Sequence, residues 1–132
     1  LLINMTPDTS GLIVQAEQQR LADFGKKIKS VFAKEVVSLT SVATGTGKVI
    51  RLNKKATLGW LELEEDIAKG QYVHSYQLEA FVNGNWKPVA SGSSIGRKRI
   101  QPMEPVETDQ LRLSVISDRP EIALQKLTVY SL

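Results

Sequence analysis

One stretch in the second half of the 132-residue chain decides the fold. Residues 76–90 read Tyr-Gln-Leu-Glu-Ala-Phe-Val-Asn-Gly-Asn-Trp-Lys-Pro-Val-Ala. An apolar residue occupies every even position from 76 to 82, and a period of two places these side chains on one face of a strand. Asn83-Gly84 then suits a type I′ turn, because both central residues of that turn need a positive φ. The stretch therefore predicts an antiparallel hairpin that pairs residues 77–82 with 86–90.

Short segments with the same strand-like character lie on both sides of this hairpin. Glycine, proline, asparagine and serine separate them, and these residues are typical of turns. We expect further strands at residues 35–40, 48–52, 57–64, 97–103, 111–116 and 123–130, with a flexible Thr-Gly-Thr-Gly link at 44–47. Strands of this length and spacing predict an all-β fold, an antiparallel sandwich or jelly roll.

The first part of the chain follows a different pattern. Residues 1–4 form a short apolar run, typical of a buried strand, and a cluster of turn formers follows at 6–11. From about Val14 apolar residues recur at three- and four-residue steps, as on one face of a helix. The residues of this face are Leu21, Phe24, Ile28 and Val31 or Phe32. One strand-turn-helix unit cannot bury its own helix face, so we expect another element to cover it. We divide the chain into residues 1–37, this unit, and residues 38–132, the β-sandwich.

Composition excludes several functional classes. The 17 Lys and Arg residues are interspersed with 14 Asp and Glu residues, so we expect no sustained positive field and no nucleic-acid partner. Charges interrupt every apolar run, which predicts no membrane-spanning segment and no membrane partner. With no cysteine and a single histidine, the sequence offers no thiolate site. We expect neither a metal site nor a cofactor. The chain starts with neither Met nor a signal-like segment, so we expect it to be part of a longer protein.

Few residues have the character of a catalytic or binding site. His74 is the only imidazole, and a nucleophile triad would need a base and an orienting partner beside it. Residues 62–66 contain four carboxylates, which we interpret as a solvated strand end, with a Ca²⁺ site as the alternative. Trp60 and Trp86 either pack against neighbours or offer stacking surfaces to a sugar. The basic run at 97–99 is typical of a charged edge strand.

Several segments resemble bacterial α-L-fucosidases. Residues 1–13 read Leu-Leu-Ile-Asn-Met-Thr-Pro-Asp-Thr-Ser-Gly-Leu-Ile, similar to the family pattern Leu-Leu-Leu-Asn-Ile-Gly-Pro-Asp-x-x-Gly-x-Ile at the end of the catalytic barrel. The helix that follows has the family's Leu-x-x-x-Gly step. Segments 78–87, 92–100 and 106–113 resemble the C-terminal β-sandwich of the family. Met5-Thr6 replaces the usual Ile-Gly, and Arg97 stands where the family often has Tyr.

The resemblance implies a parent enzyme that hydrolyses terminal α-L-fucose with retention, using two carboxylates about 5 Å apart. Both carboxylates lie upstream of the matching region, so no residue here inherits a catalytic role and the chain alone should be inactive. The resemblance further implies a sandwich of the galactose-binding or discoidin type and a periplasmic or extracellular parent. The partner that the resemblance implies is the catalytic barrel. Without that barrel, we expect the exposed helix face to fold onto the sandwich, to pair with a second copy of the chain, or to fray.

Two main roles remain for the sandwich after this resemblance, with an unrelated interaction module as a third alternative. In the first the sandwich is structural and covers the flank of the catalytic barrel. In the second it is a carbohydrate-binding module for fucose, galactose or a fucosylated glycan. Fucose-binding lectins of a similar fold use a His and two Arg, and His74, Arg97 and Arg99 are the candidates for these donors. Arg97 and Arg99 share one face of a strand, so their side chains could converge.

Overall fold

A computed structural model of the chain describes residues 2–132 and separates them into two compact units. The first unit ends at Ala33 and the second covers Lys34–Leu132. The second unit is made of six strands and one short 3₁₀ helix. These elements are β1 (Glu35–Val42), β2 (Gly45–Glu64), η1 (Ile67–Lys69), β3 (Val73–Val82), β4 (Asn85–Gly92), β5 (Arg99–Ser117) and β6 (Leu124–Ser131).

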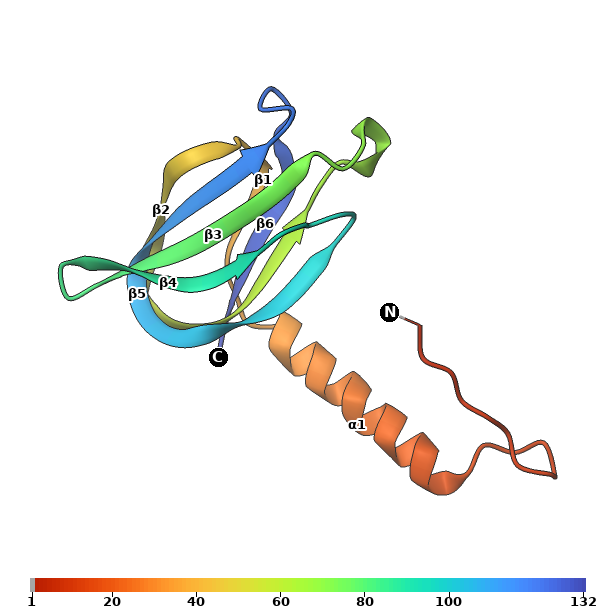
Figure 1. Cartoon of the computed structure of the whole chain (residues 1–132). Helices are drawn as coiled ribbons and strands as arrows, with labels where there is room; N and C mark the ends of the chain where they lie inside the picture. Colours follow the sequence, from red (N-terminus) through yellow and green to blue (C-terminus); the bar gives the residue numbers. More distant parts are fainter. Residues whose placement is uncertain (1) are drawn as a thin grey trace. The chain divides into compact units, whose positions relative to one another are not determined.

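The six strands form one antiparallel sheet in the order β1-β6-β2-β5-β3-β4 (Figure 1). β2 and β5 pair with each other along their length, and the register shifts between Arg51 and Ala56 of β2. Past this shift β2 also pairs with β6, whereas the C-terminal part of β5 pairs with β3. The sheet therefore folds over on itself into two layers, and the predicted antiparallel sandwich is confirmed.

The two long strands differ from the sequence prediction. The sequence predicts separate strands at 48–52 and 57–64, but both belong to β2. Residues 99–103 of the strand predicted at 97–103, and all of 111–116, belong to β5. A bulge bends a strand and increases its twist without ending its ladder of hydrogen bonds. Lysines and prolines at such a bend resemble a turn in sequence, so the prediction divided each strand. The expected flexible link at 44–47 also contributes to β2, which begins at Gly45.

The core lies between the two layers. Leucines and valines of the long strands and of β3 and β6 face inward at alternate positions, as the period of two predicts. The fully buried large apolar residues are Leu58, Leu61, Leu63, Leu78, Leu111, Leu113, Leu124, Leu127 and Val129. Because most of these residues come from β2, β5 and β6, the strands in the middle of the sheet hold the fold together.

The predicted hairpin is confirmed. Asn83 and Gly84 have φ angles of 50° and 81°, the positive pair that a type I′ turn needs. Phe81 pairs with Trp86, and Val82 pairs with Asn85. The predicted pairing of residues 77–82 with 86–90 is therefore present, with one register shift after Leu78.

Replacing Gly84 with Val should destabilise the sandwich by about 1–3 kcal/mol, because a β-branched residue is strained at positive φ. A chemical denaturation curve would measure this loss. Gly84→Asn is the matched control, since Asn tolerates the left-handed region and should lose much less. Equal stability of the Val variant and the wild type would contradict the turn type.

The first unit contains the predicted helix, α1 (Gln15–Phe32). The strand predicted at 1–4 is absent from its described part: residues 2–6 have no strand partner, and Leu1 lies outside the described residues. A strand needs a neighbour for its N–H and C=O groups, and this unit supplies none among the described residues. Pro7 and Ile13 form an isolated bridge around the turn instead. The carboxylate of Asp8 accepts hydrogen bonds inside that turn.

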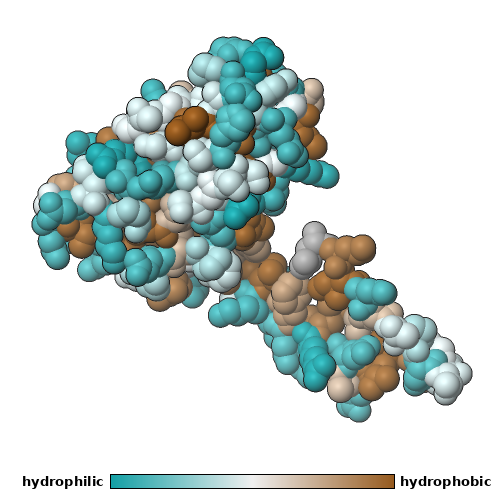
Figure 2. All heavy atoms as spheres, viewed as in Figure 1, coloured by the Kyte–Doolittle hydropathy of each residue, from teal (hydrophilic) through white to brown (hydrophobic). Residues whose placement is uncertain are grey.

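The helix of this unit exposes its apolar face. None of the α1 residues is buried, and Leu21, Phe24 and Ile28 are 42%, 40% and 38% exposed. In Figure 2 hydrophobic atoms are gathered along this unit. Ile3 and Met5 lie beside Leu21 and Phe24 around an open pocket of about 260 Å³. We call Leu21, Phe24 and Ile28 the apolar helix face.

Among residues 2–132, no helix has both the length and the apolar character needed to span a membrane.

Candidate functional site

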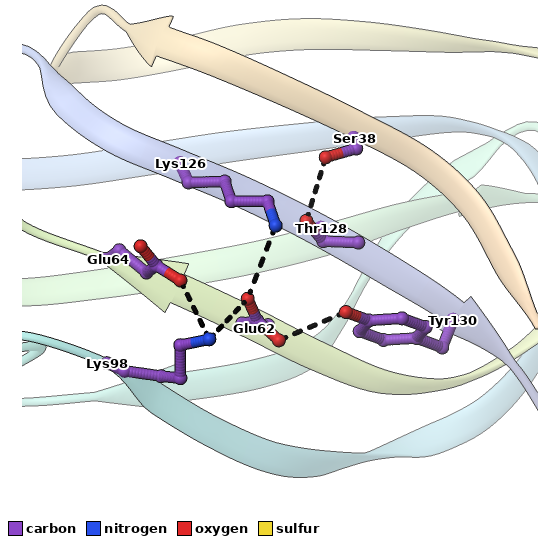
Figure 3. A network of polar contacts seen from close by, with 7 residues as sticks. All are labelled: Ser38, Glu62, Glu64, Lys98, Lys126, Thr128 and Tyr130. Carbon is purple, nitrogen blue, oxygen red and sulfur yellow. Dashed lines mark hydrogen bonds and ion pairs between the residues drawn. The ribbon is translucent and has the colours of Figure 1, made fainter. Parts of the chain in front are cut away.

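A buried carboxylate lies at the centre of a polar network on one layer of the sandwich (Figure 3). Glu62 of β2 is only 3% exposed, and its Oε2 accepts a hydrogen bond of 3.0 Å from the Tyr130 hydroxyl of β6. The Lys98 ammonium lies 3.3 Å from Oε1 of Glu62 and 3.0 Å from Oε1 of Glu64. Lys126 approaches the same Glu62 oxygen at 3.7 Å. Glu62 Oε1 is thus neutralised by ion pairs but accepts no hydrogen bond among the described residues.

These neighbours keep Glu62 ionised. Burial raises the pKa of its carboxyl, but the hydrogen bond from Tyr130 and the nearby Lys98 ammonium lower it more, so the pKa lies below its ordinary value. Burial and the Glu62 carboxylate raise the pKa of the Tyr130 phenol. A general acid at neutral pH would need a raised carboxyl pKa. The network therefore has the properties of a structural ion pair.

The lowered pKa makes part of the stability sensitive to acid. Because the folded-state pKa of Glu62 is lower than the unfolded one, its contribution is present above the unfolded pKa and is lost as pH falls through the folded pKa. At neutral pH, Glu62→Gln should destabilise the chain by about 1–2 kcal/mol, since Tyr130 and Lys98 lose a charged partner.

Melting temperatures measured from about pH 7 to about pH 3 would test this effect. The difference between wild type and Glu62→Gln should shrink as the pH falls, because protonation neutralises the wild-type carboxylate as well. Glu107→Gln is the control, since Glu107 is exposed and belongs to no such network. A difference that stays constant with pH would contradict an ionised Glu62.

A second buried carboxylate fastens two loops at one end of the sandwich. Glu65 is 5% exposed. The backbone N–H groups of Tyr72 and Val73 donate to its Oε1 at 3.0 and 3.1 Å. The N–H of Gly96 donates to its Oε2 at 2.7 Å. Glu65 therefore ties the segment before β3 and the segment between β4 and β5 to the end of β2.

These positions correct the interpretation of residues 62–66 as a solvated strand end. That prediction is wrong for Glu62 and Glu65, which are both buried, because elements distant in sequence fold over them and supply donors. Glu64 and Asp66 remain partly exposed. The residues that the structure describes contain no group of three or more His, Asp or Glu side chains that could hold a metal ion.

The donors proposed for a sugar lie in different surroundings. His74 is exposed at the start of β3, and its Nε2 lies 2.7 Å from Oδ1 of Asp118, the residue that follows β5. Arg97 is exposed in the segment between β4 and β5. Among residues 2–132, no hydrogen bond or ion pair joins His74 to Arg97 or Arg99.

Arg99 is held at the first position of β5. Its Nε donates to Oε1 of Gln101 at 3.0 Å, and a terminal nitrogen donates to the Ser94 carbonyl at 3.3 Å. Its guanidinium carbon lies 5.9 Å from the centre of the Tyr76 ring. The Tyr76 hydroxyl donates to the same Gln101 oxygen. Arg99 thus supports the buried Tyr76, and this contact was not visible in the sequence.

Trp86 packs within the chain. Its ring lies 5.1 Å from that of Phe81, and the Arg112 guanidinium carbon lies 4.5 Å from the ring centre. Arg112 also donates to both carboxylate oxygens of Glu79 at 2.7 and 2.8 Å. One face of the Trp86 ring is therefore covered by a cation, which favours packing over stacking on a sugar.

A groove of about 360 Å³ crosses the outer surface of β2, β5, β3 and β4. Its lining residues are Thr46, Ser75, Tyr76, Gln77, Ser91, Gly92, Ser114 and Ile116. Gln77 pairs with Ser114 on one side and with Ser91 on the other, so these polar residues form a row across neighbouring strands. We call this feature the hydroxyl groove. No local pattern predicts this groove, because its eight residues come from four strands and each strand contributes at most three of them.

The two units define a class of structure, a β-sandwich preceded by an amphipathic helix. No family model matches the chain. α-L-Fucosidase 1 of Arabidopsis thaliana is 27% identical over 98% of this chain and 32% of its own length. A glycoside hydrolase 29 family member from an unknown rumen bacterium superimposes with a TM-score of 0.84 and 31% identity, over 99% of this chain and 25% of that one. The chain spans about a third of the length of the curated relatives that it matches.

Over nearly its whole length the chain is similar to the C-terminal portion of α-L-fucosidases, as its sequence motifs predicted. The sandwich by itself has a second likeness. The family 32 carbohydrate-binding module of Streptococcus pneumoniae EndoD superimposes with a TM-score of 0.53, 16% identity and coverage of 65% of this chain and 69% of the module. At that identity the likeness concerns the fold alone.

Proposed function

We propose that this chain is the C-terminal accessory region of an α-L-fucosidase-like glycoside hydrolase, with a sandwich that supports the catalytic barrel and performs no catalysis. The similarity to the C-terminal portion of such proteins supports this proposal. The carboxylates of Glu62 and Glu64 both form an ion pair with Lys98. A retaining glycosidase needs one carboxylate free to attack and a second to donate a proton.

The apolar helix face is the observation that carries this proposal. Burying a large apolar side chain contributes about 1.5–3 kcal/mol, so three such residues left exposed in a row indicate a missing neighbour. Gly25 lies on the same side of α1 with nothing within 4 Å of an added methyl group. A glycine inside a helix costs about 1 kcal/mol relative to alanine. Close packing of another element against α1 at this position would explain why a glycine lies beside the apolar helix face.

A chimera tests the structural role. The catalytic part of the rumen-bacterium protein, joined to this chain in place of its own matching region, should unfold in one cooperative transition. Phe24→Asp should weaken that chimera by at least about 1.5–3 kcal/mol, the burial of one large side chain. Lys27→Asp is the control, because Lys27 lies largely outside the apolar stripe. Independent unfolding of the two parts, unaffected by Phe24→Asp, would contradict the role.

The isolated chain should hydrolyse an aryl α-L-fucoside no faster than buffer does. Activity that persists through repurification would contradict a non-catalytic role.

Self-association through the apolar helix face stays a prediction, which light scattering at several concentrations would test. A periplasmic or extracellular parent is likewise a proposal that rests on resemblance.

Carbohydrate binding is the second candidate function, and the fold shared with a carbohydrate-binding module favours it. Binding through His74, Arg97 and Arg99 stays a prediction. Two of these three donors already have protein partners, His74 with Asp118 and Arg99 with Gln101. A sugar at this position would therefore have to displace or share existing contacts.

A further inference from the structure

We propose that the hydroxyl groove is a binding site for a neutral sugar, separate from His74, Arg97 and Arg99 and independent of the structural role of the sandwich. Its volume of about 360 Å³ falls within the range typical of pockets for small ligands. The outer sheet surface that it crosses is built from the four neighbouring hydrogen-bonded strands β2, β5, β3 and β4.

The polar side chains of the groove are available to a ligand. Among residues 2–132, Thr46, Ser75, Gln77 and Ser91 use no side-chain atom in a hydrogen bond to protein. Hydroxyl and amide groups both donate and accept, which matches the mixed donors and acceptors of sugar hydroxyls. The four side chains come from β2, β3 and β4 and meet in one groove because the strands are in register.

The groove selects against charged ligands. None of its eight lining residues carries a carboxylate, an ammonium or a guanidinium group. A charged ligand would lose hydration there and gain no counter-ion, which is unfavourable. Ile116 is 59% exposed at the groove and supplies an apolar surface for the C–H face or the methyl group of a sugar ring.

A peptide is the less suitable occupant. Extended peptides add to the edge of a sheet, where backbone N–H and C=O groups are unpaired. The hydroxyl groove instead crosses the face of β5 and β3, whose backbone groups are paired on both sides. The free groups of the groove are therefore side chains, which suit a ligand that is itself rich in hydroxyls.

Amide NMR on the isotopically labelled full chain tests the site, with fucose, galactose and the charged glucuronate each added to about 100 mM. We expect saturable shifts at Ser75, Gln77 and Ser91 with fucose or galactose, with a Kd on the order of 1–10 mM. Glucuronate should bind more weakly. Absence of saturable shifts with both neutral sugars, or tighter binding of glucuronate, would overturn the proposal.

Two double variants locate the site. Gln77→Ala/Ser91→Ala should weaken sugar binding about tenfold, since it removes two neutral hydrogen-bonding groups, whereas His74→Ala/Arg97→Ala should leave the affinity unchanged. If Gln77→Ala/Ser91→Ala lowers the melting temperature, Thr46→Ala at an exposed position replaces it as the test. Loss of binding only in the His74/Arg97 variant would move the site away from the groove. The chimera experiment measures unfolding in the absence of sugar, so it tests the structural role separately from the sugar-binding proposal.

Discussion

Replacing Glu65 with alanine should destabilise the sandwich by about 3–5 kcal/mol, because three partly buried backbone N–H groups lose their common acceptor. These groups belong to Tyr72, Val73 and Gly96, at 2.7–3.1 Å from the carboxylate. Because Glu65 joins both segments to the end of β2, the loss should appear as loosened loops and as a lower global stability. Thermal unfolding should show a fall of more than about 10 °C.

Glu65→Gln is the matched control for this prediction. The amide keeps the shape and one carbonyl acceptor but points N–H donors at a site that needs acceptors, so an intermediate loss is expected. Hydrogen exchange at Tyr72, Val73 and Gly96 should accelerate in the alanine variant before exchange in the central strands does. Unchanged protection of these three amides would contradict the role assigned to Glu65.

Replacing Gly92 with valine should destabilise the sandwich by about 2–4 kcal/mol, through overpacking and the loss of a partly buried hydrogen bond. A Cβ at this position would lie 2.5 Å from the Tyr76 hydroxyl oxygen and 2.7 Å from the ring carbon that bears it. Tyr76 is only 3% exposed, so its ring has no room to move aside. Its hydroxyl would also be forced away from Gln101.

A double-mutant cycle with Tyr76→Phe separates the two parts of this loss. Phenylalanine lacks the oxygen nearest to the new Cβ, so Gly92→Val should be less harmful in that background than in the wild type. The measurement is the free energy of unfolding from denaturant titration for all four proteins. Purely additive effects would show that Gly92 and Tyr76 do not contact each other in the way described.

Local pattern in the sequence determined the elements of this protein. The period of two in residues 76–82 and the Asn83-Gly84 pair lead to the hairpin, because both depend only on neighbouring residues and on the φ angles that Gly and Asn tolerate. The three- and four-residue steps after Val14 determine α1 in the same way. The sequence alone also predicts the similarity to the C-terminal portion of α-L-fucosidases, because the motifs that carry this similarity are short continuous segments of the chain.

Only the tertiary structure decided which polar residues are buried and which surfaces are hollow. Glu62 and its donor Tyr130 are 68 residues apart in the chain, and Glu65 and Gly96 are 31 residues apart. A carboxylate at a strand end has the same local pattern whether solvent or a distant loop covers it. The hydroxyl groove likewise depends on the register of four strands and on the bend that folds β2 and β5 over the core. Burial and register are set by contacts between distant segments, and a one-dimensional pattern contains no record of them.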